Sequence, residues 1–83
     1  MKQTVYFERA NGQLIAIDAT ECAEDKRVGT AFAAIKHFCK EHNYHIPYMR
    51  TWDEDRQGQL MTCIDVGSHV EFFLVHPPLN FST

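Results

Sequence analysis

Residues 4–17, TVYFERANGQLIAI, decide the fold that the sequence predicts. Thr4 to Arg9 alternates and is rich in β-forming residues, and Asn11-Gly12 separates it from a second apolar run, Leu14 to Ile17. Two such runs around an Asn-Gly pair are typical of a β-hairpin. This hairpin is the starting point from which the rest of the chain can be assigned.

The register of the hairpin follows from the side chains that each loop length would gather on one face. A two-residue loop would mix charged residues into the apolar face. A three-residue loop, residues 10–12, pairs Phe7 with Ile15 and gives its glycine the left-handed conformation of a bulge. It also pairs Val5 with Ile17, so that the apolar side chains share one face. Because register follows the buried face, we expect the three-residue loop.

A helix is expected next, over residues 24–42. Apolar residues recur there at three- and four-residue steps, which is the spacing of one helical stripe. Asp25 and its acidic neighbours suit the positive end of the helix dipole, and Asn43 can take a left-handed cap. The stripe consists of Val28, Ala31, Phe32, Ile35, Phe38, Cys39 and His42.

Alternation with a period of two returns after the helix. A strand from Tyr44 to Trp52 would place Ile46, Tyr48, Arg50 and Trp52 on one face. Pro47 cannot donate a backbone hydrogen bond, which indicates a sheet edge. Residues 53–58, DEDRQG, then predict a polar turn.

The remaining residues predict a second hairpin, formed by residues 60–66 and 70–76 around Gly67-Ser68. Pro77-Pro78 ends regular pairing. The order ββαβββ corresponds to an α+β fold, an antiparallel β-sheet with one amphipathic helix packed on one face. Core candidates are Val5, Phe7, Ile15, Ile17, Phe32, Ile35, Phe38, Ile64, Phe72 and Leu74.

Length and composition predict a single domain over residues 1–83, with 78–83 as a C-terminal tail. Eighty-three residues, 45% of them hydrophobic, supply material for one core. Eight basic residues are scattered among eleven acidic ones, which disfavours a nucleic-acid partner. Three cysteines, no signal-like N-terminus and no long apolar run favour a cytoplasmic protein without a membrane partner.

The last two predicted strands carry apolar residues on both faces, more than one helix can cover. The C-terminal residues 79–81 or another chain would have to cover the second face. We therefore expect a homodimer through that face. Its predicted contact residues are Met61, Cys63, Phe73 and Val75.

No combination of residues predicts catalysis, a cofactor or a metal site. Cys39, His42 and His45 stand at three-residue steps, but no paired cysteine motif accompanies them, and Cys39 lies on the apolar stripe. A small zinc-binding protein is therefore kept only as an alternative. Cys63 also lies in an apolar pattern, which makes a reactive thiol unfavourable.

Tyr48, Arg50 and Trp52 allow three interpretations: packing in the core, a protein interface, or stacking on single-stranded nucleic acid. Together with the apolar second face, they favour a small non-enzymatic protein-interaction domain, an adaptor, inhibitor or regulator with a protein partner. In size and composition the chain is similar to small inhibitors and adaptors of mobile genetic elements. A single-stranded nucleic-acid accessory domain using these three residues is the alternative.

Overall fold

The computed structural model describes residues 1–79, and residues 80–83 lie outside the described part. Most of the predicted tail, Phe81 included, therefore falls outside it. Within the described part, five strands and one helix follow the order ββαβββ. The elements are β1 (Lys2–Glu8), β2 (Leu14–Glu21), a 3₁₀ turn η1 (Glu24–Lys26), α1 (Arg27–Glu41), β3 (Arg50–Arg56), β4 (Gln59–Asp65) and β5 (Phe72–His76).

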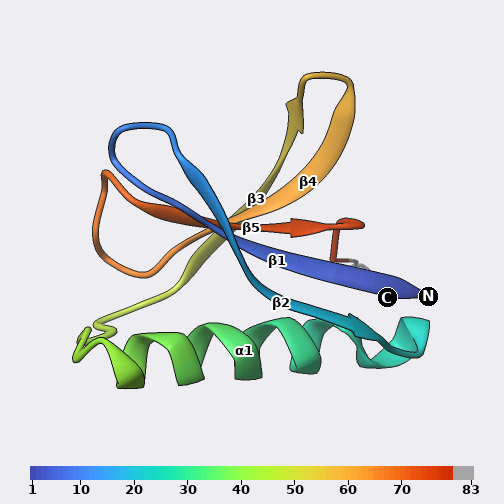
Figure 1. The fold of residues 1–83 in the computed structure, drawn as a ribbon, viewed down its shortest axis with the longest axis horizontal. Coiled ribbons are helices and arrows are strands. Elements are labelled where there is room, and N and C mark those ends of the chain that lie inside the picture. Colours follow the sequence, from blue (N-terminus) through green and yellow to red (C-terminus); the bar gives the residue numbers. More distant parts are fainter. Residues whose placement is uncertain (80–83) are drawn as a thin grey trace.

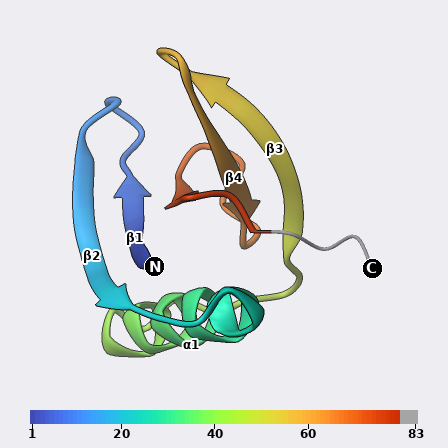
Figure 2. The ribbon, with the colours of Figure 1, turned by 90° about the vertical axis from the view of Figure 1, so that its right-hand side faces the viewer.

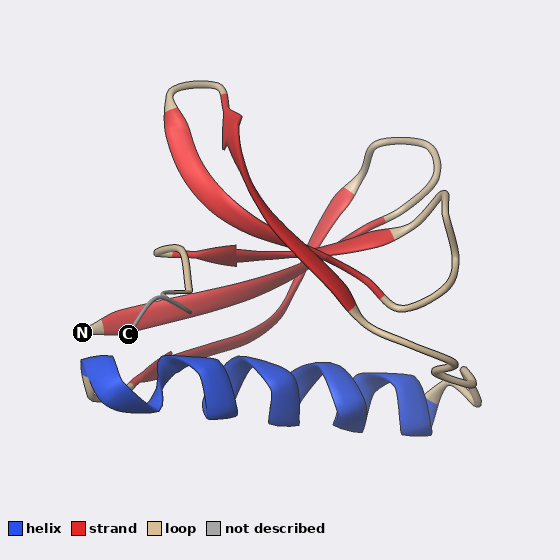
Figure 3. Cartoon of the chain, turned by 180° about the vertical axis from the view of Figure 1, so that it is seen from behind, coloured by secondary structure: helices blue, strands red, loops and turns tan. Residues whose placement is uncertain are grey.

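The sheet is antiparallel and has the strand order β2-β1-β5-β4-β3. Helix α1 forms a separate layer along one side of the strands (Figures 1 and 3). The predicted fold class, an α+β fold with one helix packed on an antiparallel sheet, is confirmed. Strand β5 comes last in the sequence but lies between β1 and β4, so that it joins the two hairpins into one sheet.

The loop of the first hairpin has the predicted length. Phe7 lies opposite Ile15, and the backbone N–H of Arg9 donates to the carbonyl of Gln13 at 2.8 Å. These contacts leave residues 10–12 as the loop, and its glycine has the positive φ, +90°, that the bulge requires. The three-residue loop is confirmed.

A second irregularity in this hairpin was not predicted. A bulge between Val5 and Tyr6 shifts the register, so that Val5 lies opposite Asp18 and not opposite Ile17. A bulge bends the strand and increases its right-handed twist. The expected Val5–Ile17 pair is therefore wrong, and the hairpin twists along its length.

The helical region agrees with the prediction over residues 24–42. The turn η1 and helix α1 together cover residues 24–41, and Asn43 follows with φ of +58°, the predicted left-handed cap. The buried residues of α1 recur every four positions, at Arg27, Ala31, Ile35 and Cys39. Among residues 1–79, no helix combines the length and the apolar character needed to cross a bilayer.

Strand β3 differs from the prediction at both ends. It begins at Arg50, and residues 42–49 before it have no regular pairing. The acidic run 53–55, predicted as a turn, continues the strand and pairs with β4. Only Gln57-Gly58 turn the chain, both with positive φ, which matches a two-residue type I′ turn. Because this turn needs two residues, the acidic run remains in β3, at an edge where water can solvate it.

The main core lies between α1 and the sheet. At its centre, the ring of Phe73 lies 5.2 Å from that of Phe7 and 5.6 Å from that of Phe38, measured between centroids. Leu79 is buried there as well, and its backbone N–H donates to the Thr62 hydroxyl at 2.8 Å. The buried members are Val5, Phe7, Ala31, Ile35, Cys39, Ile64, Val66, Phe73, Val75 and Leu79.

The predicted core residues differ in how deeply they are buried. Val5, Phe7, Ile35, Ile64 and Leu74 are buried, and Ile17, Phe32, Phe38 and Phe72 are half-buried. Ile15 is exposed because it lies on the edge strand β2, where no further strand covers it.

The two faces of the last hairpin are not those that the sequence predicts. Residues directly opposite each other in an antiparallel pair share a face. Ile64 lies opposite Phe73 and Cys63 opposite Leu74, so even-numbered residues of β4 share a face with odd-numbered residues of β5. Phe73 and Val75 therefore face the helix, whereas Met61 and Cys63 lie on the far face with Leu74. The prediction that Met61, Cys63, Phe73 and Val75 form one surface is wrong.

The chain itself covers the apolar residues of the far face. Met61, Cys63 and Leu74 are buried there, with Tyr6 packed against them. Arg56 of β3 donates to both carboxylate oxygens of Glu8 of β1, at 2.6 and 3.1 Å. Two strands separate β1 from β3 in the sheet, so only a strongly curled sheet allows this contact.

The curl is visible where the hairpins β1–β2 and β3–β4 rise on opposite sides and lean together at their tips (Figure 2). Arg56 also donates to Glu54, and its hydrogen bonds to the two carboxylates raise the pKa of its guanidinium. Met61, Cys63 and Leu74 are thus buried within the single chain, with the curl of the sheet and the Glu8–Arg56 ion pair on their side. The part of the expected cover at residues 80 and 81 lies outside the described residues, and cover by another chain stays a prediction.

Replacing Phe73 tests the importance of the aromatic core. We expect Phe73→Ala to lower the free energy of unfolding by about 3–5 kcal/mol, because it empties a buried site between two rings. Leu60→Ala is the control, since Leu60 is half-exposed on β4, and its expected effect is within about 0.5 kcal/mol. Urea unfolding followed by circular dichroism measures both. Equal effects of the two substitutions would contradict the assigned core.

Candidate functional site

Three residues that the sequence singled out lie together at the β3 edge of the sheet, where Trp52 shares the far face with its partner Cys63. The guanidinium carbon of Arg50 lies 5.8 Å from the ring centroid of Tyr48 and 6.0 Å from that of Trp52. Trp52 in turn makes an edge-on contact with the half-buried Phe72, with 5.8 Å between centroids. We call Tyr48, Arg50, Trp52 and Phe72 the aromatic strip. Tyr48 and Trp52 are 38% and 37% exposed, so core packing is not their main environment.

Hydrogen bonds hold the exposed rings of the strip in place. The Tyr48 hydroxyl and the Nε2 atom of His69 are 2.8 Å apart. The indole N–H of Trp52 donates to a carboxylate oxygen of Glu54 at 3.4 Å. Both rings therefore have a polar partner within the chain, which favours these positions before any partner binds and lowers the entropy that binding would lose.

The carboxylate of Asp65 organises the strip from below. Asp65 is fully buried at the end of β4, and Arg50 donates to its Oδ2 atom at 2.8 Å. Its Oδ1 atom accepts the backbone N–H groups of Gly67 at 3.0 Å and His69 at 3.3 Å. The Asp65 side chain thus holds Arg50, which belongs to β3. It also holds the first residues of the 66–71 loop, which joins β4 to β5.

The same contacts set the ionisation of Asp65. Burial alone would raise the pKa of this carboxyl group, because it disfavours the charged form. The hydrogen bonds from Arg50, His69 and Gly67 outweigh burial and hold the pKa below its ordinary value. In return, the hydrogen bond to Asp65 raises the pKa of Arg50. Asp65 is therefore a buried anion whose partners all donate to it.

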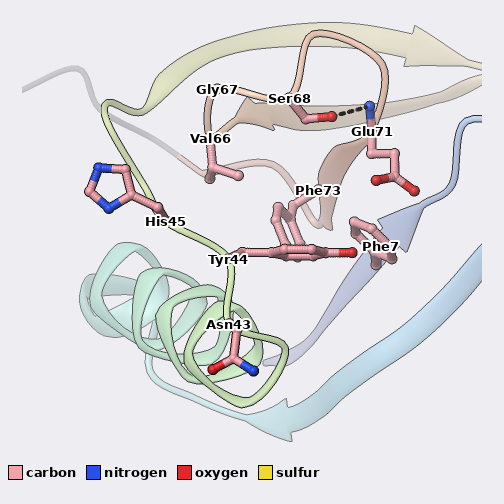
Figure 4. A pocket seen from close by; sticks show the side chains of 9 residues that line it. All are labelled: Phe7, Asn43, Tyr44, His45, Val66, Gly67, Ser68, Glu71 and Phe73. Atoms are coloured by element: carbon pink, nitrogen blue, oxygen red, sulfur yellow. Dashed lines mark hydrogen bonds between the residues drawn. The ribbon is translucent and has the colours of Figure 1, made fainter.

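A pocket of about 280 Å³ opens beside the 66–71 loop, at the end of α1 (Figure 4). Phe7 and Phe73 form its floor, and Tyr44 forms a wall. Both floor residues belong to the aromatic core, so the pocket gives a surface opening to a part of the core that is otherwise covered. The nine residues that line it are Phe7, Asn43, Tyr44, His45, Val66, Gly67, Ser68, Glu71 and Phe73.

The four residues predicted for a dimer interface are not on the surface. Met61, Cys63, Phe73 and Val75 are all buried, on two different faces of the sheet. A homodimer stays a prediction, but it would need another surface. Tyr48, Arg50 and Trp52, the other predicted interface residues, lie together and are accessible.

The thiols and histidines of residues 1–79 lie in different environments. Burial raises the pKa of Cys39, and it is the main reason that the pKa of Cys63 rises to about 11. His42 packs on the Phe38 ring and is exposed, as is His45, whereas Cys39 points into the core. Within residues 1–79, no group of three or more His, Cys, Asp or Glu side chains is placed to hold a metal ion.

Three residues that matter for these surfaces were not predicted from the sequence: Asp65, His69 and Glu71. One signal was available for Asp65. It interrupts the apolar run 63–66, CIDV, and a charged residue inside an apolar strand is rarely buried without partners. The sequence alone did not identify those partners, because Arg50 lies on another strand.

Comparison of the chain with known protein families, with curated proteins and with solved structures finds no match.

Gly67 allows the 66–71 loop to approach the segment before β3. A Cβ atom at Gly67 would lie 2.7 Å from Cγ and 2.9 Å from Cδ of Pro47, and its φ is +106°. Gly12 is a matched control, because it has φ of +90° and open space around it. We expect Gly12→Ala to cost roughly 1–2 kcal/mol of stability from backbone strain. Gly67→Ala should cost at least about 1 kcal/mol more, because Pro47 must move. Equal losses in urea unfolding would contradict this close packing.

Replacing Asp65 should change how stability depends on pH. A carboxyl group with a lowered folded-state pKa stabilises the fold above its ordinary pKa of about 4, and this contribution disappears as the pH falls through the lowered value. Asn can still accept hydrogen bonds but carries no charge. We expect Asp65→Asn to be about 1 kcal/mol less stable than the wild type at pH 7. The difference should shrink below pH 4, as measured by urea unfolding at several pH values. A constant difference down to pH 2 would contradict the assignment.

Proposed function

We propose that this chain is a non-enzymatic protein-binding domain whose contact surface is the aromatic strip. The observation that carries the proposal is the arrangement of Arg50, which lies over two exposed aromatic rings and is held by a buried carboxylate. Tyr, Trp and Arg are the residue types that most often dominate the binding energy of protein interfaces. Here all three are adjacent and ordered by contacts within the chain.

The position of the strip supports this function. Strand β3 is at the edge of the sheet, so a partner can approach the strip from the front and from the side. The strip combines apolar ring surface with polar groups at its margin, in Glu54 and His69. An apolar centre with a polar margin is typical of protein interfaces.

Two observations favour a protein over single-stranded nucleic acid. The charge of Arg50 is already matched by Asp65, so it offers little to a phosphate group. The rest of β3 adds the acidic run 53–55, which would repel a phosphate backbone. The same acidic run favours a partner with basic residues around an apolar contact.

The thiols of the described residues give no support to nucleophilic catalysis. Cys39 and Cys63 are buried with raised pKa values, and Cys22 is partly buried beside Gln3. A raised thiol pKa lowers the fraction of the reactive thiolate at neutral pH.

Two substitutions in the strip test the proposal. We expect Trp52→Ala and Arg50→Ala each to weaken partner binding by at least about tenfold, because central aromatic and arginine residues contribute about 2 kcal/mol or more. Leu14→Ala is the matched control, since Leu14 is an exposed apolar residue on the opposite edge strand and should have little effect. Each of the four proteins is immobilised and used to capture partners from a protein extract. A protein that the wild type and the control capture, and that neither strip variant captures, is purified, and its affinity is measured by calorimetry.

Two results would contradict the proposal. One is direct binding to the purified partner that survives both strip substitutions. The other is salt-sensitive quenching of Trp52 fluorescence by single-stranded oligonucleotides, with no protein that depends on the strip. The second result would assign the strip to nucleic acid.

A further inference from the structure

The pocket beside the 66–71 loop is separate from the aromatic strip and has a different chemistry. Its floor consists of Phe7 and Phe73, which are 6% and 1% exposed, with Val66 beside them. The ring of Tyr44 stands at its side, 6.4 Å from the Phe7 ring between centroids. The pocket thus presents aromatic surface from three parts of the chain: β1, β5 and the segment after α1.

One charged side chain points into this aromatic pocket. Figure 4 shows the Glu71 side chain reaching from the loop toward the rings of Phe7 and Tyr44. The backbone N–H of Glu71 donates to the Ser68 hydroxyl at 3.0 Å, which fixes the residue in the loop. No ion pair involves the Glu71 carboxylate within the part of the chain that the structure describes. The carboxylate is therefore available to a ligand.

The other lining residues do not supply a competing cation. None of the nine is Lys or Arg, and the one histidine, His45, points away from the cavity in Figure 4. Asn43 also points away from the rings. The inside of the pocket therefore carries one negative charge and the negative faces of aromatic rings.

Aromatic faces and a carboxylate together define the class of ligand. The face of an aromatic ring attracts an organic cation within about 6 Å, by about 0.5–2 kcal/mol. A carboxylate adds Coulombic attraction in a site partly shielded from water. At about 280 Å³, the pocket is slightly smaller than the range of about 300–1,000 Å³ that is usual for small-molecule sites. This size suits one alkylammonium group with a short chain.

We propose that this pocket binds an alkylammonium cation, with the cation between the Glu71 carboxylate and the rings of Tyr44, Phe7 and Phe73. The cation can belong to a small free amine or to a lysine side chain of a bound protein, and the chemistry of recognition is the same. Binding at this pocket does not depend on the aromatic strip, which lies on β3 and uses other side chains.

The test uses choline and its neutral isostere, 3,3-dimethylbutan-1-ol, which have the same shape and differ in charge. Each is titrated into the full chain labelled with ¹⁵N, and amide chemical shifts are followed. We expect choline to shift the amides of Tyr44, Gly67, Ser68 and Glu71 and to bind at least about fivefold more tightly than the alcohol. Nα-acetyl-lysine methylamide is titrated in parallel. Tighter binding of this compound than of choline would identify a lysine side chain as the source of the cation, and the reverse would identify a small free alkylammonium compound.

A comparison of Glu71→Gln with Glu24→Gln distinguishes choline binding at the pocket from general attraction of choline to a negatively charged protein. Both remove one negative charge, but Glu24 lies at the other end of the helical region, in η1. We expect Glu71→Gln to weaken choline binding at least about fivefold and Glu24→Gln to leave it unchanged. The inference is overturned if choline and the alcohol bind equally, if 50 mM choline shifts none of these amides, or if Glu71→Gln retains full affinity. We expect Trp52→Ala to bind choline normally although it weakens partner binding. The failure of one proposal can therefore be distinguished from the failure of the other.

Discussion

The buried carboxylate of Asp65 is the constraint on which both candidate surfaces depend. A buried charge is tolerated only when it is paired and hydrogen-bonded, and Asp65 meets this condition with Arg50 and two backbone N–H groups. The three donors belong to two different elements, β3 and the 66–71 loop. Arg50 carries the aromatic strip, and the backbone of residues 67 and 69 begins the loop that lines the pocket. One desolvated anion thus couples the edge strand to the loop.

The curl of the sheet is the second organising feature. With one helix, a flat sheet of five strands would leave one apolar face in water. Here the bulge in the first hairpin and the general twist bring the two hairpins together, and Glu8 and Arg56 join across the far face. Met61, Cys63 and Leu74 are buried without help from another chain. The buried apolar residues of the last strands are therefore explained by the fold itself.

The two proposed sites both involve the 66–71 loop, but they use different residues of it. At His69 the 66–71 loop turns outward and supports Tyr48 in the strip. At Glu71 it turns inward and brings a carboxylate to the opening of the aromatic core. A protein that contacts the strip would lie close to this loop. The position of the loop is fixed through Asp65, whereas each site uses its own side chains.

The sequence by itself determined the elements whose signals are local. The Asn-Gly loop, the helical stripe over residues 24–42 and the left-handed Asn43 follow from short-range sterics and hydrogen bonds, and the structure has all three. Tertiary structure alone decided which faces of β4 and β5 coincide, where β3 begins, and what surrounds Asp65. These features depend on pairing between distant strands, and a shift of one residue exchanges the two faces of a strand. That register cannot be predicted from a local pattern, because it is fixed by contacts that form only when the whole sheet closes.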